Sequence, residues 1–270
     1  ENPVNSLEYI EIYNRSDKLL DVSGLIFTTR KTDGTLNSGI KIPSTTYILP
    51  NDYLAVTADA DSVRQYHKCP LGANIISTEW TSLNNEEATI VLCNGAKDTI
   101  YDELSYNTAW HHILISDPKG VALERIQPNG LTQDALNWHS AASEVNYGTP
   151  GYQNSQYQTT GNNEAENTVW CDPKAFSPDN DGNNDVCFIR YKSEYEGFVA
   201  NVSIYNPAGI LITNIAQNAL LSANGYFSWD GKTIRGLNAE TGIYVLYFEM
   251  FHPKTGKKQI HKLPLVVSGL

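Results

Sequence analysis

The sequence predicts an all-β protein with two β-rich parts, each folded as a sandwich or barrel. Runs of alternating apolar and polar residues recur at intervals of roughly ten residues, as they do in all-β domains. The 270 residues include 16 tyrosines, 19 glycines and 12 prolines, a composition that favours short strands and turns over long helices. Residues 152–168 have almost no aliphatic side chains. They cannot bury a core, so we expect them to separate the two parts.

The first part begins with a strand over residues 7–13, LEYIEIY, in which apolar and polar side chains alternate. Residues 19–29 predict a second strand that is interrupted at Gly24. Residues 46–58 predict two strands joined by a turn at residues 50–52, because Pro-Asn-Asp is a typical turn sequence. These segments together indicate antiparallel β structure.

One helix is predicted in this part, over residues 59–69. Asp59 or Asp61 supplies the N-cap, and Val63 and Tyr66 follow at helical spacing. Further short strands, separated by Gly, Asn, Asp or Pro, are predicted at residues 88–94, 99–106, 111–116 and 121–126.

The second part has about 100 residues, the size of an immunoglobulin-like sandwich. We place the first domain at residues 1–153, a flexible polar linker at 154–168 and the second domain at 169–270. The strand-like runs of the second domain cover residues 186–192, 198–215, 225–231, 242–251 and 258–268.

The charge distribution argues against nucleic-acid binding. Residues 1–168 carry ten Lys and Arg against 21 Asp and Glu, a net charge of −11, while the remaining residues carry nine of each sign. Affinity for phosphate backbones comes from Lys and Arg, which neither part has in excess. No apolar run approaches the roughly 20 residues that span a bilayer. Because the first strand follows Glu1 so closely, we expect further sequence upstream.

The cysteines Cys69, Cys93, Cys171 and Cys187 contain no C-x-x-C pair, so neither a zinc ribbon nor a thioredoxin-type motif is present. Three pairings are open to four cysteines. If the chain divides near residue 160, the local pairing is Cys69 with Cys93 and Cys171 with Cys187. Such disulfides would indicate an oxidising compartment, whereas four buried free thiols would suit a cytosolic protein.

An ordered series of motifs in the first part resembles the lamin tail domain as it occurs in secreted proteins of the Bacteroidetes type. The resemblance covers residues 7–155 and implies an immunoglobulin-like β-sandwich. The first strand of that family is missing here, which again suggests a trimmed start. The motifs are EYIEIYNRSDKLLDVSGLIF, LPNDYLAVT, LNNEEATIVLCNG, GVALERI and NWHSAASEVNYGTPGYQNS.

The second part resembles the immunoglobulin-like domain of the flagellar hook-capping protein. It shares FSPDNDGNNDV, VSIYNPAGILI and WDGKTIRGLNAETGIYVLYF with that family's pattern. Related modules end many exported Bacteroidetes proteins, including gliding-motility proteins and type IX secretion cargo. The resemblance implies an extracytoplasmic address (periplasm, cell surface or secreted) and the type IX secretion machinery as a partner. It implies no reaction.

The Asp-rich segment between Cys171 and Cys187 is the candidate metal site. Asp179, Asp181, Asn183 and Asp185 would be the ligands of a structural calcium ion, since hard cations need several oxygen ligands on a short loop. The EF-hand pattern is not met. We favour the simpler explanation, in which these side chains bond their own backbone in successive turns. No other cofactor is indicated.

The sequence gives little support for catalysis. Neither G-x-S-x-G nor a nucleotide-binding glycine motif occurs. In a strand, His111 and His112 would point to opposite faces and could not hold one metal. The acidic pairs at residues 86–87 and 102–103 are best explained as solvated surface groups.

Aromatic residues leave glycan binding open. Trp80, Tyr152 and Tyr157 lie in polar stretches where exposed rings could stack on sugars, whereas Trp229 and Tyr244 belong to motifs that suggest a core role. We therefore expect a non-catalytic C-terminal region that serves in surface presentation, adhesion or export scaffolding. The alternative is a glycan-binding accessory module of an upstream hydrolase, and an enzyme would need a clustered acid–base set.

Overall fold

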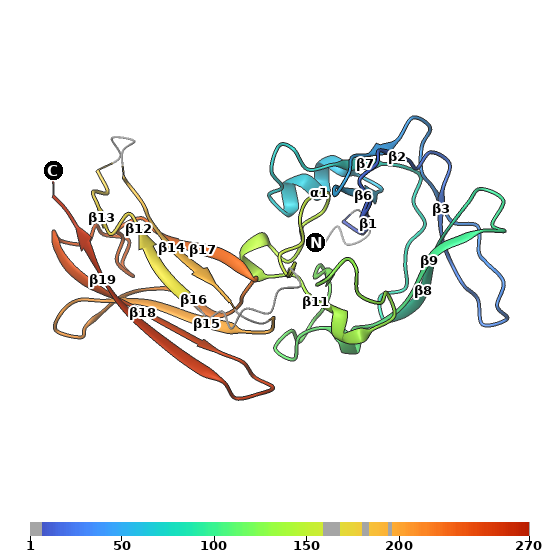
Figure 1. Ribbon diagram of the computed structural model, residues 1–270. Coiled ribbons are helices and arrows are strands. Elements are labelled where there is room, and N and C mark those ends of the chain that lie inside the picture. The colour runs from blue at the N-terminus through green and yellow to red at the C-terminus, as the bar shows by residue number, and fades with distance from the viewer. Residues whose placement is uncertain (1–6, 159–167, 180–183, 194–195, 270) are drawn as a thin grey trace. The chain divides into compact units, whose positions relative to one another are not determined.

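The computed structural model describes residues 7–158, 168–179, 184–193 and 196–269 (Figure 1). Strands make up 42% and helices 6% of the chain, which confirms the predicted all-β fold. The chain divides into two compact units, which we describe separately. The first unit comprises Glu1–Ala141 and Val145–Thr160, and the second comprises Ala142–Glu144 and Gly161–Leu270.

The first unit contains a three-stranded sheet of order β1-β6-β7, a four-stranded sheet of order β4-β3-β8-β9, and the strand pairs β2-β5 and β10-β11. All strand pairs in this unit are antiparallel except β6-β7. The strands are β1 (Tyr9–Tyr13), β2 (Leu20–Asp21), β3 (Ile26–Thr29), β4 (Ile40–Lys41), β5 (Tyr47–Ile48), β6 (Tyr53–Thr57), β7 (Ile75–Ser77), β8 (Glu87–Cys93), β9 (Ile100–Asn107), β10 (Leu123–Arg125) and β11 (Trp138–Ser140).

The two larger sheets of the first unit share one hydrophobic core. Ile10 and Ile12 of β1 and Leu54 of β6 pack in the same cluster as Phe27 of β3 and Ile40 of β4. Alternation along each strand sends these side chains to one face. Full burial of each such side chain contributes about 1.5–3 kcal/mol.

Helix α1 (Ala60–Tyr66) covers a second, smaller cluster. The Asp59 carboxylate accepts hydrogen bonds of 3.1 Å from the backbone N–H groups of Asp61 and Ser62, so Asp59 is the N-cap. Val63 is fully buried and packs with Ala55. The predicted helix and the first of its two candidate caps are confirmed.

The strand predicted over residues 111–116 is wrong. A 3-10 turn, η2 (Thr108–Trp110), leads into a further turn there, in which the Ile115 N–H donates to the His112 carbonyl at 2.9 Å. The Ser140 side chain accepts a hydrogen bond from the His112 backbone N–H and bonds the His111 ring, each at 2.9 Å. These tertiary contacts outweigh the β-propensity of the sequence. The other 3-10 turns are η3 (Ala135–Asn137) and η4 (Ser143–Val145).

The start of the predicted flexible linker is ordered, which corrects that prediction for residues 154–158. The Ser155 hydroxyl donates to Glu124 at 2.7 Å, and the Gln158 backbone N–H donates to the Ile126 carbonyl at 3.0 Å. Polar side chains hold this segment by hydrogen bonds, a mechanism that the composition argument ignored. Residues 159–167 of the predicted linker lie outside the described residues, and residue 168 already belongs to a strand.

The second unit is a sandwich of two sheets (Figure 1). One sheet has the order β12-β14-β17 and the other the order β13-β19-β18-β15-β16. The β13-β19 pair is parallel, and the other pairs are antiparallel. The strands are β12 (Thr168–Asp172), β13 (Ala175–Phe176), β14 (Cys187–Lys192), β15 (Val199–Tyr205), β16 (Leu211–Leu220), β17 (Asn224–Trp229), β18 (Gly242–Phe251) and β19 (Lys258–Val267).

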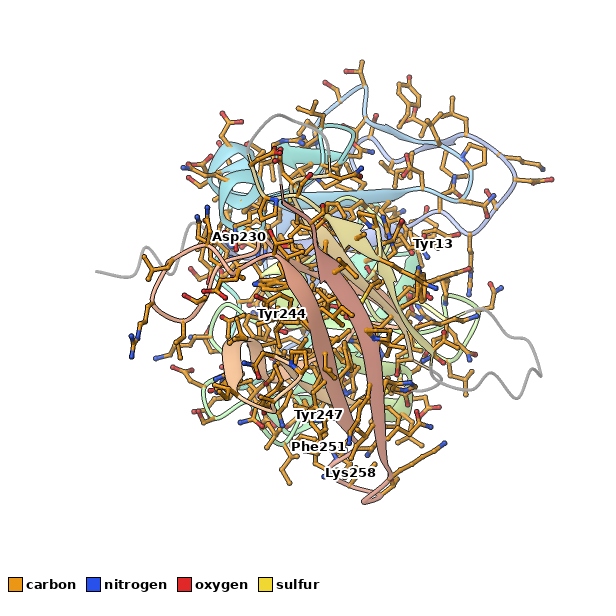
Figure 2. All side chains as sticks on the ribbon, turned by 90° about the vertical axis from the view of Figure 1, so that its left-hand side faces the viewer. Tyr13, Asp230, Tyr244, Tyr247, Phe251 and Lys258 are labelled. Atoms are coloured by element: carbon orange, nitrogen blue, oxygen red, sulfur yellow. The ribbon has the colours of Figure 1, made fainter. Side chains whose placement is uncertain are left out.

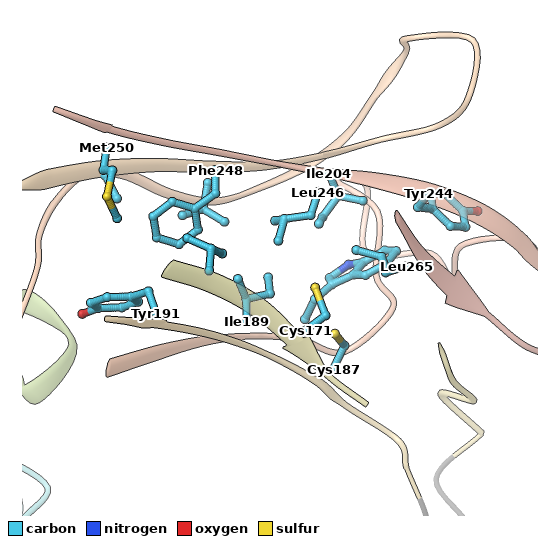
Figure 3. Close-up of a cluster of buried hydrophobic side chains, with 14 of the residues drawn as sticks. Cys171, Cys187, Ile189, Tyr191, Ile204, Tyr244, Leu246, Phe248, Met250 and Leu265 are labelled. Atoms are coloured by element: carbon cyan, nitrogen blue, oxygen red, sulfur yellow. The ribbon is translucent and has the colours of Figure 1, made fainter. Parts of the chain in front are cut away.

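The core of the second unit lies between its two sheets (Figure 3). Ile189 and Tyr191 face it from β14, and Leu246, Phe248 and Met250 face it from β18. Every second residue of both strands is buried, which is the pattern of a strand with one face in the core. The outward positions of these strands are therefore free for function.

Candidate functional site

Two cysteines begin and end the Asp-rich segment of the second unit. Cys171 of β12 and Cys187 of β14 are both buried, and their sulfurs lie close together in the core (Figure 3). A hydrogen bond from the Cys187 thiol lowers the pKa of Cys171 and raises the pKa of Cys187. The two sulfurs are not bonded to each other in the structure, so the disulfide stays a prediction.

Cys69 and Cys93 have different neighbours. Cys69 packs against the cluster that contains Val63 and Ile75. Cys93 is buried in β8, and its thiol donates to the carbonyl of Ile26 at 3.6 Å. Burial raises the pKa of both thiols, which argues against a reactive thiolate at either position. Their pairing also stays a prediction.

The predicted calcium loop is only partly described. Asp181 and Asn183 lie outside the described residues, while Asp179 and Asp185 flank them. Backbone turns order the flanks, since the Asp179 N–H donates to the Ser177 carbonyl at 2.9 Å. Within the described ranges, no group of three or more His, Cys, Asp or Glu side chains could hold a metal ion. Calcium therefore stays a hypothesis.

Trp229 of the Trp-Asp-Gly motif (residues 229–231) and Tyr244 of the Gly-Ile-Tyr motif (residues 242–244) are buried in the core, as predicted. The Trp229 ring contacts the Phe176 ring at a centroid distance of 5.3 Å and the Tyr244 ring at 5.4 Å, both edge to face. The Trp229 indole N–H donates to the Lys232 carbonyl at 2.9 Å. The Tyr244 hydroxyl donates to the Glu240 carbonyl at 2.7 Å. These partners satisfy the polar atoms of both rings, so the motifs are structural.

The neighbouring histidines do not form a chelating pair. His111 bonds Ser140, and burial lowers the pKa of the His111 ring to about 4. His112 is buried, with its ring 5.5 Å from that of His139. The prediction that the two histidines do not hold one metal was based on a strand, whereas the structure has turns at these positions.

The sequence did not predict two carboxyl groups of the first unit whose pKa is raised by burial, Glu11 and Glu124. Glu11 accepts a hydrogen bond of 2.7 Å from the Gly151 backbone N–H, and Glu124 accepts one of 2.6 Å from the Thr149 hydroxyl. Burial raises the pKa of both carboxyl groups. Both carboxyl groups accept hydrogen bonds from the Gly-Thr-Pro-Gly motif at residues 148–151, which closes the first unit. Gly151 of this motif has a φ of +76°, which favours glycine. The alternation in YIEIY (residues 9–13) places Glu11 on the face of the strand that Ile10 does not occupy. This pattern could have identified Glu11 as an inward-facing carboxyl group.

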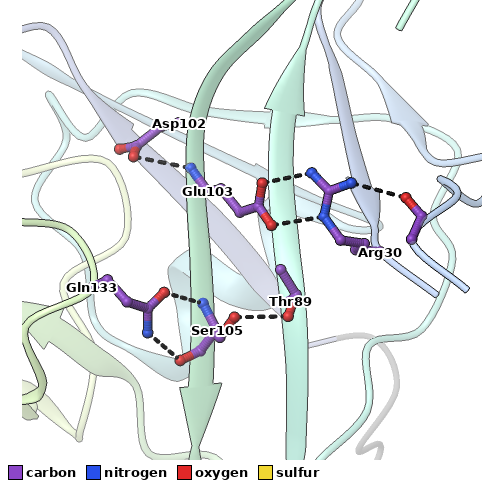
Figure 4. Close-up of polar contacts among 7 residues, drawn as sticks. Arg30, Thr89, Asp102, Glu103, Ser105 and Gln133 are labelled. Carbon is purple, nitrogen blue, oxygen red and sulfur yellow. Dashed lines mark hydrogen bonds and ion pairs between the residues drawn. The ribbon is translucent and has the colours of Figure 1, made fainter. Parts of the chain in front are cut away.

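The acidic pairs show no acid–base arrangement. Glu86 and Glu87 are exposed. Glu103 accepts two hydrogen bonds, of 2.6 and 2.7 Å, from the Arg30 guanidinium (Figure 4), and these bonds lower the pKa of Glu103. A carboxylate held ionised in this way is a structural ion pair, unlike the raised-pKa acid that glycoside hydrolysis needs.

The three aromatic residues proposed for glycan stacking are not exposed. Trp80 packs against the core of the first unit, and its indole N–H donates to Glu8 at 2.9 Å. Tyr152 packs against the cluster beneath helix α1, and Tyr157 is half-buried. The expected platform is therefore wrong at these positions.

A different aromatic cluster lies on the outer face of the β12-β14-β17 sheet. Trp170, Phe188 and Tyr226 are 43%, 36% and 53% exposed. The Phe188 and Tyr226 rings meet edge to face at 5.4 Å, and the Arg190 guanidinium lies 5.6 Å from the Phe188 ring centre. The alternation in TVWCD (residues 168–172) could have identified Trp170 as exposed. Neighbouring side chains of a strand point to opposite faces, so Trp170 faces outward when Cys171 is buried.

The outer face of the five-stranded sheet is different in character. Tyr247, Phe251 and Lys258 lie along β18 and β19 (Figure 2). The Lys258 ammonium pairs with Glu249 at 3.1 Å, and the Lys262 ammonium lies 5.8 Å from the Tyr247 ring centre. Ile243 and Ile260 are exposed on this face, but the Tyr247 and Phe251 rings are half-buried, so it offers fewer exposed rings.

A comparison with known families finds a match within the second unit. Residues 171–266 match the family described as CHU_C Type IX secretion signal domain. The matched segment contains both cysteines, Trp229 and Tyr244. The match covers this one unit and indicates an exported protein with an extracytoplasmic address. A secretion signal domain is not catalytic.

Solved structures give only distant likenesses. CopC from Methylosinus trichosporium OB3b is 17% identical, with a TM-score of 0.26, over 38% of this chain and 95% of that one. Dimeric latent PorU from Porphyromonas gingivalis is 11% identical, with a TM-score of 0.31, over 70% and 13%. PorZ, a type IX secretion surface component of the same organism, is 11% identical, with a TM-score of 0.29, over 89% and 32%. No curated protein matches the chain.

The described part of the chain contains no helix long and apolar enough to cross a membrane.

Proposed function

We propose that this chain is a non-catalytic C-terminal region whose second unit directs export by the type IX secretion machinery. The match over residues 171–266 carries this proposal. The unit has its own two-sheet core and the strand order of a complete sandwich. A signal of this kind is a folded domain, so its recognition depends on surface features of the sandwich and not on a short linear peptide.

The first unit is the segment that such a signal would carry to the surface. Its motif order supports a lamin-tail-like sandwich, and we assign it a role in presentation or adhesion. Glu103, His111 and Glu11 are all engaged in structural contacts, with Arg30, Ser140 and Gly151 respectively. None of these arrangements supports a hydrolytic mechanism, so the chain itself is assigned no reaction.

The proposal is tested by attaching an inert reporter to the N-terminus of the chain in a bacterium with a type IX system. The fusion to residues 1–270 should reach the surface or medium, whereas a fusion to residues 1–158 should stay in the periplasm. A secretion-deficient strain is the control, because both fusions should then stay inside. Equal export of the two fusions would contradict the proposal.

A further inference from the structure

The outward side chains of the β12-β14-β17 sheet form a grid, which we call the outer grid. Cross-strand register places residues of the three strands directly opposite one another. Opposite residues in neighbouring strands point to the same face. The three rows of the outer grid are Thr168, Lys192 and Asn224; Trp170, Arg190 and Tyr226; and Asp172, Phe188 and Ser228.

Each aromatic ring of the outer grid has hydrogen-bonding groups beside it. Arg190 stands between Trp170 and Tyr226 in the middle row. Its Nε atom lies 3.5 Å from the Asp172 carboxylate, and both side chains are partly exposed. A guanidinium supplies several donors and a carboxylate several acceptors. The outer grid thus alternates flat apolar surface with donors and acceptors over a few ångströms.

The outer grid is large enough for a short stretch of a polymeric ligand. Strands lie about 4.8 Å apart and rise about 3.3 Å per residue, so the grid measures about 10 by 13 Å. Two or three sugar rings cover such a patch.

Charge and ring geometry narrow the ligand further. Arg190 pairs with Asp172, so Lys192 is the only further charged residue of the grid, and one added cation gives little affinity for a phosphate or a polyanion. The Phe188 and Tyr226 rings are inclined at 80°, so they cannot form one flat platform for a crystalline polymer. A single hydrated chain presents apolar C–H faces to the rings and hydroxyl groups to the charged pair.

We propose that the outer grid binds a neutral saccharide chain, with Trp170 and Tyr226 stacking on sugar rings and Arg190 and Asp172 bonding hydroxyl groups. This site goes beyond the export function and does not depend on it. It makes the second unit a surface anchor after secretion as well as a signal during it.

The test is affinity electrophoresis of the purified full chain in native gels. The probes are hydroxyethylcellulose, xyloglucan, mannan and laminarin as neutral polysaccharides, and polygalacturonate as an acidic one. At least one neutral polysaccharide should retard the chain. Trp170→Ala should weaken that retardation tenfold or more and Tyr226→Ala severalfold. Trp170→Phe should keep part of it. Tyr101→Ala is the matched control, because Tyr101 is 58% exposed on the first unit.

Four outcomes would overturn the proposal. The first is that no neutral polysaccharide retards the chain. The second is that the natural chain and Trp170→Ala are retarded equally. Retardation by polygalacturonate alone would indicate simple charge attraction. Self-association that depends on Trp170, measured by analytical ultracentrifugation, would make the outer grid a protein contact. Melting curves of each variant check folding, and because no cell is involved, failure here leaves the export proposal untouched.

Discussion

The backbone N–H of Gly151 donates a hydrogen bond of 2.7 Å to the carboxyl group of Glu11, 140 residues earlier in the chain. This bond ties the closing motif of the first unit to its first strand. Burial raises the pKa of this carboxyl group well above the ordinary value. The contact between the closing motif and the first strand therefore contains a titratable group.

Replacing Glu11 by Gln should change the pH dependence of stability. A raised folded-state pKa means that the Glu11 contribution is complete below about pH 4.3, its unfolded value, and is lost as pH rises through the folded pKa. Gln keeps an acceptor for Gly151 and stays neutral. We expect Glu11→Gln to gain a few degrees in melting temperature over the natural chain at pH 8, and to lose that gain near pH 4. Equal differences at both pH values would contradict this expectation.

Replacing Glu103 by Gln should give the opposite pH dependence. Its folded-state pKa is lowered by Arg30, so the stability it contributes is present at neutral pH and lost as pH falls through the folded pKa. Because the Arg30–Glu103 pair is partly exposed, Glu103→Gln should lower the free energy of unfolding by about 0.5–1 kcal/mol at pH 7. Urea unfolding in low and high salt measures this loss of stability. A loss that is the same in high salt would argue against an ion-pair contribution.

Oxidation should join Cys171 to Cys187. Glutathione disulfide would take the two thiol hydrogens and leave two glutathione molecules and one protein disulfide. Closing a loop of this length stabilises a domain by up to about 3 kcal/mol. Mass spectrometry should detect the loss of two hydrogens, and the second unit should melt at higher temperature than under reducing conditions. Cys187→Ser is the control, and an unchanged mass after oxidative refolding would refute the pairing.

Calcium should not alter the stability of the second unit. We favour backbone turns over an ion at the Asp-rich loop, whose flanks at Asp179 and Asp185 are the described part of the candidate site. A bound ligand at 100 times its dissociation constant would add about 2.7 kcal/mol. Melting curves in millimolar calcium and in chelator should therefore coincide. An upward shift with calcium that Asp185→Asn abolishes would show instead that the loop is a metal site.

Local pattern predicted most of the fold. Alternation identified β1, β6, β9 and the long strands of the second unit, and a side-chain cap identified helix α1. These features depend on neighbours within a few residues, which the sequence shows directly. The failures at His111 and at Ser155 share one cause. Both segments are held by distant partners, Ser140 and Glu124, which no local pattern could supply.

The candidate site was harder to predict because exposure is a property of the assembled sheet. Trp80 and Tyr152 stand in polar sequence, yet tertiary packing covers them. Trp170 lies between buried Val169 and Cys171 in a strand that was not predicted from the sequence, and its own side chain faces outward. Strand register then brings Arg190 and Tyr226 beside it from segments 20 and more residues away, which sequence spacing alone does not reveal.

The most direct test of the central claim follows the chain itself in cells. Protease added outside intact cells should digest the full chain at the surface when the type IX apparatus is functional. The chain should be protected when that apparatus is inactivated, or when residues 168–270 are removed. Protease-accessible chain in cells that lack the apparatus would contradict the assignment of the second unit as a type IX secretion signal.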